Sequence, residues 1–558
     1  MNKLRIILTV CAVILFCSCS KKPDVLYVNG KFYTLDNNNS VVEAVAVRKG
    51  QILELGKSTE LKEKYSSVKV IDLNGKTVVP GFIDSEGNLM EFSKQLSLLD
   101  LRSANSLDEI KKLLRERIKT AKESEWIGGF GWDDLKLTDK ELQHLDKSIL
   151  DSISTKHFIY LVNSYGNTTW VNSALLAATK VTKDTPDPEE GEIGVNEKDE
   201  PSGLFYDDAQ EFVIKILPQP TEQQVMDNLE NGMNELFRYG ITEVCDVNIT
   251  EDGLNVYKKM VDANKFRIRL YVMIPAKSPL AEKYFNSGPE NYKDRISVKC
   301  MHLEYDGYFS TQDAAMENDY KEEPKRKTPY NDAFDIMEMT RKAYEKGFQI
   351  SVKAIGDRAI TATLNAIDSV MKSSSKKTGR NRIEYLEFVN PNNMQRLKSL
   401  DIIPSFRPEV TLEDKVVAGE IISSEIIKSL GMWSSALRQT GMISCGSDFP
   451  YHTISPLIQM YYLATGMTLD SAANKIANNS AQKISVLEAL KSYTTWAAYS
   501  IFAEETKGTL EKGKFADFVV LSDDILSSDP QILLRTKIMM TIVNGEIVFE
   551  NKLISSLP

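Results

Sequence analysis

Three ionisable side chains alternate along one apolar segment of this sequence. His302, Glu304 and Asp306 are each separated by a single residue, and residues with that spacing share one face of a β-strand. Two interpretations are equally well supported. The three side chains form a polar site that acts on a ligand, or they belong to a polar layer whose hydrogen bonds are satisfied inside the protein.

Oxygen-bearing side chains follow two other apolar segments. Glu86 and Asn88 come shortly after Asp84, and Asp448 ends the segment that begins at Met442. Carboxylates are good ligands for divalent metals, whereas an amide oxygen is a weaker one. The chain has only four histidines, so a metal site built mainly from imidazole groups is not expected.

The segments that carry these residues belong to a series of alternating strands and helices. Amphipathic patterns such as 223–239, 332–346 and 358–372 separate most of the β-rich segments. This alternation predicts an α/β fold with a TIM-like (β/α)8 barrel, in which functional side chains lie at the carboxyl ends of the strands. The predicted strands are Thr77–Asp84, Ile241–Val247, Phe266–Ile274, Ile296–Tyr305, Gln349–Ile355, Arg382–Val389, Ile402–Phe406 and Met442–Asp448.

Both ends of the chain carry hairpin signals. Asn29-Gly30, Lys49-Gly50 and Asn544-Gly545 each stand between β-rich segments, which is the pattern of a tight β-turn. We therefore predict a small β-sandwich domain built from residues 24–79 and 501–553. Residues 80–500 form the predicted barrel. Within it, the long stretch at about 90–240 is expected to be an insertion with its own packing.

The N-terminus has the pattern of a targeting segment. Residues 1–18 combine a short basic region with the apolar run Ile6–Phe16, which is typical of a signal peptide. The sequence up to Cys19 resembles a bacterial lipobox, with Cys19 as the lipidated residue and residues 19–23 as a tether. We expect a protein anchored by lipid at the bacterial cell envelope, facing the periplasm or the outside. Plain secretion is the alternative.

Charge and length restrict the partners. The net charge of −10 and the pI near 5.3 argue against nucleic acid or an anionic membrane surface as the main partner. The 558 residues are 42% hydrophobic, which is enough for more than one core. We expect a small-molecule ligand or substrate, with membrane contact only through the lipid anchor.

Several motifs together resemble a known family. The chain is similar to the amidohydrolase superfamily, and specifically to amidohydrolase family 3, the branch with YtcJ-like and N-substituted-formamide-deformylase-like members. The resemblance runs from about Asp24 to Phe549. It implies a hydrolase of non-peptide C–N bonds, with one or two metals at the barrel mouth that activate a water molecule. The motifs are Pro80–Asp84, Gly129–Trp132, Trp170–Leu175, Ala354–Ala359, Gly446–Pro450 and Lys507–Phe518.

Most of the family's metal-ligand positions hold other residues in this chain. Of the positions that match, only Asp448 keeps the family residue, and the resemblance assigns to it the transfer of the proton. Two further histidine positions of the family hold Asn167 and Cys245. Trp132, Arg407 and His452 are predicted to line the pocket together with Glu304 and Asp306. The positions that correspond to metal ligands are Glu86, Asn88, His302, Lys353, Tyr385 and Asp448.

Lys353 is the most consequential substitution, because an ammonium group repels a divalent cation and offers it no lone pair. One hypothesis places Lys353 in the former metal position, neutralised by Glu86 and Asp448. The alternative is that Lys353 reaches solvent and pairs with nothing. We expect no cofactor, and zinc or another divalent metal only if the substituted site still binds it. The chain is then a hydrolase without the usual metal-dependent mechanism, or an inactive, envelope-anchored binding protein.

Overall fold

The computed structural model of the protein describes residues 22–164, 166–321, 331–376, 378–470, 477–527 and 529–552. The predicted signal peptide and the predicted lipidation site Cys19 lie outside these ranges. Within the described ranges, no helix combines the length and the apolar character needed to cross a membrane.

Eight parallel strands form the central sheet, in the order in which they occur along the chain. The backbone N–H of Asp448 donates to the carbonyl of Glu86 at 3.0 Å and brings the last strand back to the first. The predicted barrel is therefore confirmed. Its strands are β8 (Phe82–Gly87), β15 (Ile241–Val247), β16 (Arg269–Pro275), β18 (Ile296–Glu304), β19 (Gln349–Lys353), β20 (Asn381–Glu384), β21 (Ile402–Phe406) and β22 (Ser444–Cys445).

The first barrel strand differs from the prediction. Residues 77–84 were expected to be one strand, but β7 (Thr77–Pro80) pairs with a strand of a different sheet, and only β8 belongs to the barrel. The break falls at Gly81, where a Cβ atom would lie 2.3 Å from Thr242 Oγ1. Close approach of the backbone to Thr242 therefore requires glycine at this point.

Amphipathic helices cover the outside of the barrel. The predicted segments correspond to α9 (Glu222–Arg238), α12 (Ala333–Lys346) and α13 (Asp357–Ser373), with ends shifted by at most a residue. Local signals set two of the starts, because Thr221 and Asp332 each accept from a backbone N–H in a capping box. The apolar face of each helix then packs against the strands.

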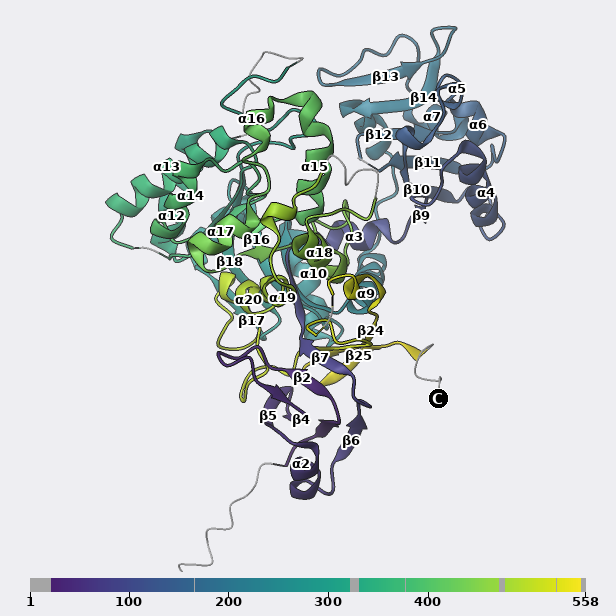
Figure 1. The fold of residues 1–558 in the computed structure, drawn as a ribbon. Helices are drawn as coiled ribbons and strands as arrows, with labels where there is room; N and C mark the ends of the chain where they lie inside the picture. Colours follow the sequence, from purple (N-terminus) through teal and green to yellow (C-terminus); the bar gives the residue numbers. More distant parts are fainter. Residues whose placement is uncertain are drawn as a thin grey trace, which may run out of the picture.

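The segment between β8 and β15 carries a sheet of its own. Six strands pair in the order β13-β14-β12-β11-β10-β9, from β9 (Leu99–Asp100) to β14 (Pro201–Asp207). They lie to one side of the barrel in Figure 1. Helix α9 falls outside the insertion, because it packs on β15 and on α3 (Leu89–Gln95). The other strands are β10 (Trp126–Trp132), β11 (Phe158–Asn163), β12 (Thr168–Val171) and β13 (Gly191–Val195).

The two chain ends lie side by side below the barrel (Figure 1). One sheet has the order β5-β4-β1-β6, and the other has the order β25-β24-β23-β7-β2-β3. Side chains of both sheets meet in one apolar cluster. The strands are β1 (Val25–Val28), β2 (Lys31–Tyr33), β3 (Val41–Val42), β4 (Ala44–Arg48), β5 (Gln51–Gly56), β6 (Lys69–Asp72), β23 (Phe518–Leu521), β24 (Ile538–Val543) and β25 (Glu546–Glu550).

Two of the three predicted hairpins are confirmed, namely β4–β5 and β24–β25. The third is wrong, because β1 and β2 belong to different sheets. A two-residue hairpin turn of this type needs positive φ at both central residues. Asn544 and Gly545 meet that condition with φ of 53° and 71°, whereas at Asn29-Gly30 only Asn29 is left-handed. The chain there passes from one sheet to the other.

Candidate functional site

A buried chain of alternating charges fills the barrel interior near its mouth. Arg382 Nε and Nη2 contact the two carboxylate oxygens of Glu384 at 2.7 and 3.2 Å. Arg407 Nη2 donates to Glu384 at 2.8 Å and also to Glu86. All four side chains are almost inaccessible to solvent. The order Arg382–Glu384–Arg407–Glu86 gives each charge at least one opposite neighbour.

The strands position these groups through their two-residue period. Arg382 and Glu384 are two residues apart on β20, so they point to the same side of the sheet. Glu86 lies near the end of β8, and Arg407 directly follows β21. The site thus draws on three barrel strands.

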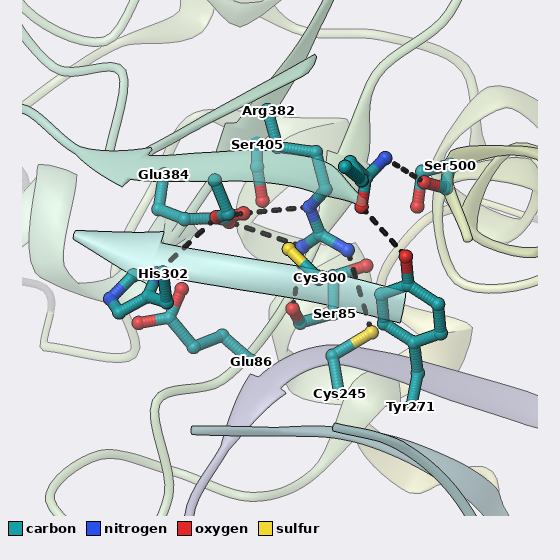
Figure 2. A network of polar contacts seen from close by, with 12 residues as sticks. Ser85, Glu86, Cys245, Tyr271, Cys300, His302, Arg382, Glu384, Ser405 and Ser500 are labelled. Atoms are coloured by element: carbon teal, nitrogen blue, oxygen red, sulfur yellow. Dashed lines mark hydrogen bonds and ion pairs between the residues drawn. The ribbon is translucent and has the colours of Figure 1, made fainter. Parts of the chain in front are cut away.

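Polar groups on adjacent strands satisfy the rest of the Arg382 guanidinium and the Glu384 carboxylate. Ser351 Oγ donates to Glu384 at 2.8 Å, and His302 Nδ1 lies 3.4 Å from that hydroxyl. Figure 2 shows Arg382 between Glu384 on one side and Ser85 and Cys245 on the other. Arg382 Nη2 donates to the Ser85 carbonyl at 2.7 Å. His302 therefore belongs to the hydrogen-bonded interior.

Burial and ion pairing shift the pKa values of Glu384 and Glu86 in opposite directions. Burial raises the pKa of Glu384, but the charges of Arg382 and Arg407 outweigh burial and hold it well below its usual range. Burial raises the pKa of Glu86 to about 8 even though Arg407 opposes it, and the charges of Glu384 and Asp448 add to the rise. Glu86 is the last residue in the series of buried ion pairs and has one cationic partner, whereas Glu384 has two.

Lys353 does not make the predicted ion pair. Its ammonium nitrogen lies 3.9 Å from the ring centre of Tyr308 and 4.9 Å from that of Tyr385. Among the described residues it has no ion pair and no hydrogen bond, and Glu86 is paired with Arg407 instead. The forked guanidinium of Arg407 can bridge two carboxylates at once, which a lysine does less well.

Asp448 sits in a second polar group beside the first. Tyr308 Oη donates to Asp448 Oδ2 at 3.1 Å, and His452 Nε2 lies 3.8 Å from the same oxygen. His452 Nδ1 is 3.5 Å from Glu413. Burial lowers the pKa of His452, but the contact with Glu413 and the charge of Asp448 outweigh burial and raise it to about 9. His452 is therefore a cation at neutral pH, paired with two carboxylates.

Several predicted site residues have structural roles. Asn88 caps α3 by accepting from the Glu91 N–H at 2.9 Å. Asp306 accepts from the backbone N–H groups of Ala315, Ile355 and Gly356, so it braces the loops after β18 and β19. This favours the polar-layer interpretation for Asp306.

Two predicted pocket residues belong to the insertion. Trp132 is 2% exposed within the core of the insertion and donates from Nε1 to the Leu161 carbonyl. Asn167 accepts from the side chain of Asn163. The structure does not bring either residue into contact with the charged network. The signal for them came from sequence similarity, not from strand ends.

Cys245 and Tyr385 lie in the barrel interior. Cys245 Sγ is 3.5 Å from Arg382 Nη1, and burial raises the pKa of its thiol to about 12 despite that guanidinium. A thiol in this state is a poor nucleophile. The Tyr385 ring lies 4.9 Å from the Arg407 guanidinium carbon and forms part of the wall around both cations. Glu304 is partly buried at the end of β18.

The residues present do not fit the metal that the resemblance implies. Among the described residues, no group of three or more histidine, cysteine, aspartate or glutamate side chains could hold a metal ion. Glu86 is already bound by Arg407, and the ammonium of Lys353 lies over Tyr308 in the same region. A divalent cation there would face two guanidinium groups and an ammonium.

A cavity of about 430 Å³ opens beside the Asp448 group. Its walls come from α3, the insertion, the end of α9, helix α15 (Pro408–Ile421) and the loop that follows β22. His452 belongs both to its wall and to the Asp448 group. The wall combines apolar and aromatic side chains with charged ones, principally Phe92, Phe130, Phe449, Glu409, Glu413 and His452.

Sequence reasoning missed two of the four network residues. Arg407 and Glu86 were candidates, but Arg382 and Glu384 were not. Their signal was available, because a charged pair two residues apart within an apolar strand indicates charges that face a buried interior together.

Comparison with known proteins identifies the family. The model of the amidohydrolase family matches residues 69–549, and the chain belongs to this family. A protein named as an amidohydrolase, YtcJ of Bacillus subtilis (strain 168), is 27% identical over 94% of this chain and 99% of its own length. The N-substituted formamide deformylase of Arthrobacter pascens is 23% identical over 94% of this chain and 98% of its own length.

A solved structure agrees with the fold. The crystal structure of an uncharacterised metal-dependent hydrolase from Pyrococcus horikoshii OT3 superposes with a TM-score of 0.75 at 21% identity. The match covers 91% of this chain and 99% of that chain. The overall fold is therefore shared with that structure.

Proposed function

We propose that this protein binds a small molecule at the mouth of an amidohydrolase barrel without the family's metal-dependent hydrolysis. The observation that carries this proposal is the buried chain Arg382–Glu384–Arg407–Glu86. Its cations supply the positive charge that a metal would otherwise provide near Glu86. The chain keeps the scaffold and the cavity and holds no donor set for a metal among its described residues.

Electrostatics supports the replacement of a metal ion by internal cations. Isolated buried charges are strongly unfavourable, so a carboxylate that has lost its metal must gain another cation or a proton. Arg407 supplies such a cation to Glu86, whose pKa burial raises to about 8. Binding a dication at Glu86 would require the Arg407 contact to break first.

Hydrolysis of a C–N bond by a metal-independent route is the second candidate. Family membership and relatives such as the formamide deformylase support a hydrolase of this broad class. The specific observation is that Asp448 touches both Tyr308 and His452 at the edge of the cavity. A carboxylate next to a protonatable imidazole could move a proton to or from a bound substrate.

Turnover assays separate the two candidates. Purified protein is incubated with N-formyl and N-acyl amines, with and without added zinc or manganese, and release of the free amine is measured. If the protein binds without hydrolysing, added metal causes no release of free amine. Any background release is then unchanged in Asp448→Asn. Metal-stimulated turnover that is lost in Asp448→Asn would overturn the proposal, and turnover indifferent to metal would favour the second candidate.

We also propose that the protein is held at the cell envelope by a lipid on Cys19. The lipobox-like sequence and the polar residues after Cys19 support this. A diacylated anchor at the N-terminus would leave the barrel in aqueous surroundings, beside the membrane surface.

A further inference from the structure

One cation in the barrel mouth makes no ion pair with a described carboxylate. Arg382 and Arg407 contact Glu384 and Glu86, and His452 contacts Asp448 and Glu413. Lys353 lies over the rings of Tyr308 and Tyr385, and its charge favours the ionised forms of Glu86 and Asp306 without contacting them.

The ammonium group of Lys353 has unmet hydrogen-bonding capacity. Lys353 is 7% exposed, and its nitrogen has no acceptor among the described residues. Three N–H donors can be met by water or by the acceptor oxygens of a ligand, and a ligand carboxylate would satisfy donors and charge together. Cation–π contacts with Tyr308 and Tyr385 hold the charge in place but supply no acceptor.

The neighbouring carboxylates are engaged elsewhere. Glu86 is bound by Arg407, and Asp306 accepts from three backbone N–H groups. Asp448 accepts from Tyr308 and lies beside His452. Glu304, the register neighbour of Lys353 on β18, makes no ion pair with it among the described residues, so the ammonium can still contact an anion that enters.

We propose that Lys353 anchors the carboxylate of an organic acid whose apolar part occupies the cavity at the barrel mouth. The ammonium supplies charge-assisted hydrogen bonds to the carboxylate oxygens. Tyr308 connects the two regions, because its ring lies under Lys353 and its hydroxyl contacts Asp448, which neighbours the cavity residue His452. The aromatic walls at Phe92, Phe130 and Phe449 suit an apolar or aromatic body.

This inference rests on the proposed function, because it names the ligand class of the same site. Different experimental results would overturn the proposed function and this inference. Metal-dependent turnover would remove the proposed function whatever Lys353 does. Ligand binding that ignores Lys353 would remove this inference and leave a metal-free binding site intact.

The test compares three probes of one shape and different charge: benzoate, benzamide and benzylamine. Binding to the full protein is measured by calorimetry and by thermal shift at constant ionic strength. We expect benzoate to bind more tightly than the other two. Lys353→Met should weaken benzoate binding by at least about tenfold, because the charge-assisted hydrogen bonds to the ammonium are lost. Lys353→Arg should retain part of the affinity.

Lys299→Met is the matched control. Lys299 is a partly buried lysine near the start of β18, at the opposite end of the barrel, and it should not affect benzoate binding. A preference for benzamide or benzylamine, or equal benzoate affinity in wild type and Lys353→Met, would overturn the inference.

A second measurement avoids substitution altogether. The rate at which an amine-specific reagent modifies Lys353 is followed by peptide mass spectrometry with and without benzoate. The inference predicts slower modification of Lys353 and an unchanged rate at Lys299. Equal rates at Lys353 under both conditions would overturn it even if Lys353→Met failed to fold.

Discussion

At the scale of single residues, Arg407 is the centre of the site. It touches both Glu86 and Glu384 and has 0% side-chain exposure. We predict that Arg407→Met lowers the free energy of unfolding by about 3–5 kcal/mol, because two buried carboxylates lose their shared cation. Urea unfolding measures the change. Arg117→Met is the control, because the partly exposed Arg117–Glu125 pair should contribute no more than about 1 kcal/mol. An equal loss in both variants would contradict this account of the network.

His452 should make stability depend on pH. Its folded pKa of about 9 lies above its ordinary value of 6.5. The folded state therefore binds the proton more tightly, so this contribution is complete below pH 6.5 and is lost as pH rises through 9. Urea unfolding at a series of pH values should show a shallower decline over that window for His452→Gln than for wild type. His144→Gln, an exposed substitution in the insertion, should follow the wild-type curve.

Local sequence patterns could predict which residues are buried and polar, but not which of them contact one another. Glu86 and Arg407 were both candidates from sequence, but their contact joins positions 321 residues apart. The local pattern indicates that each is a buried polar residue at a strand end, and only closure of the barrel decides which cation each carboxylate meets. The assignment of Lys353 to Glu86 failed for this reason.

At the scale of elements, packing decides the effect of helix glycines. Gly419 lies in α15 (Pro408–Ile421) with open space around it, so Gly419→Ala should stabilise the protein by about 0.5–1 kcal/mol. Gly232 in α9 differs, because a Cβ there would lie 2.1 Å from Ser93 Oγ on α3. Gly232→Ala should therefore destabilise the protein despite its higher helix propensity.

Adding Ser93→Ala separates the two contributions at Gly232. Removing the Ser93 hydroxyl should relieve the contact, so the double variant should recover part of the loss, as measured by urea unfolding. If Gly232→Ala raised stability as much as Gly419→Ala does, α3 and α9 would not pack as closely as described.

The sequence located some strand ends to the residue and missed others. The predicted bounds of β15 and β21 agree with the structure, because both strands are buried along their whole length. Strand β20 ends earlier than predicted because Tyr385 has a φ of 53°, a left-handed conformation that ends the strand. Nothing in the residue type of Tyr385 signals this, so the difference could be found only from the structure.

At the scale of the whole molecule, the proposed lipidation site Cys19 precedes the first strand, β1, by six residues in the sequence. We predict that Cys19→Ala moves the protein from the membrane fraction to the soluble fraction of bacterial cells, because the lipid is its proposed membrane attachment. Cys17→Ala, two residues earlier, is the matched control and should remain membrane-bound. Fractionation followed by immunoblotting measures both. Membrane retention of Cys19→Ala equal to that of wild type would contradict lipidation at this residue.

We propose that internal cations have taken the place of the catalytic metal in this barrel. The most direct test is the metal-to-protein ratio, measured by inductively coupled plasma mass spectrometry on protein purified without chelator and again after incubation with zinc or manganese. The account predicts a ratio far below stoichiometric in both samples, because Arg407 occupies Glu86 and Lys353 stands in the same region. Stoichiometric zinc, manganese or iron that is retained through gel filtration would contradict it.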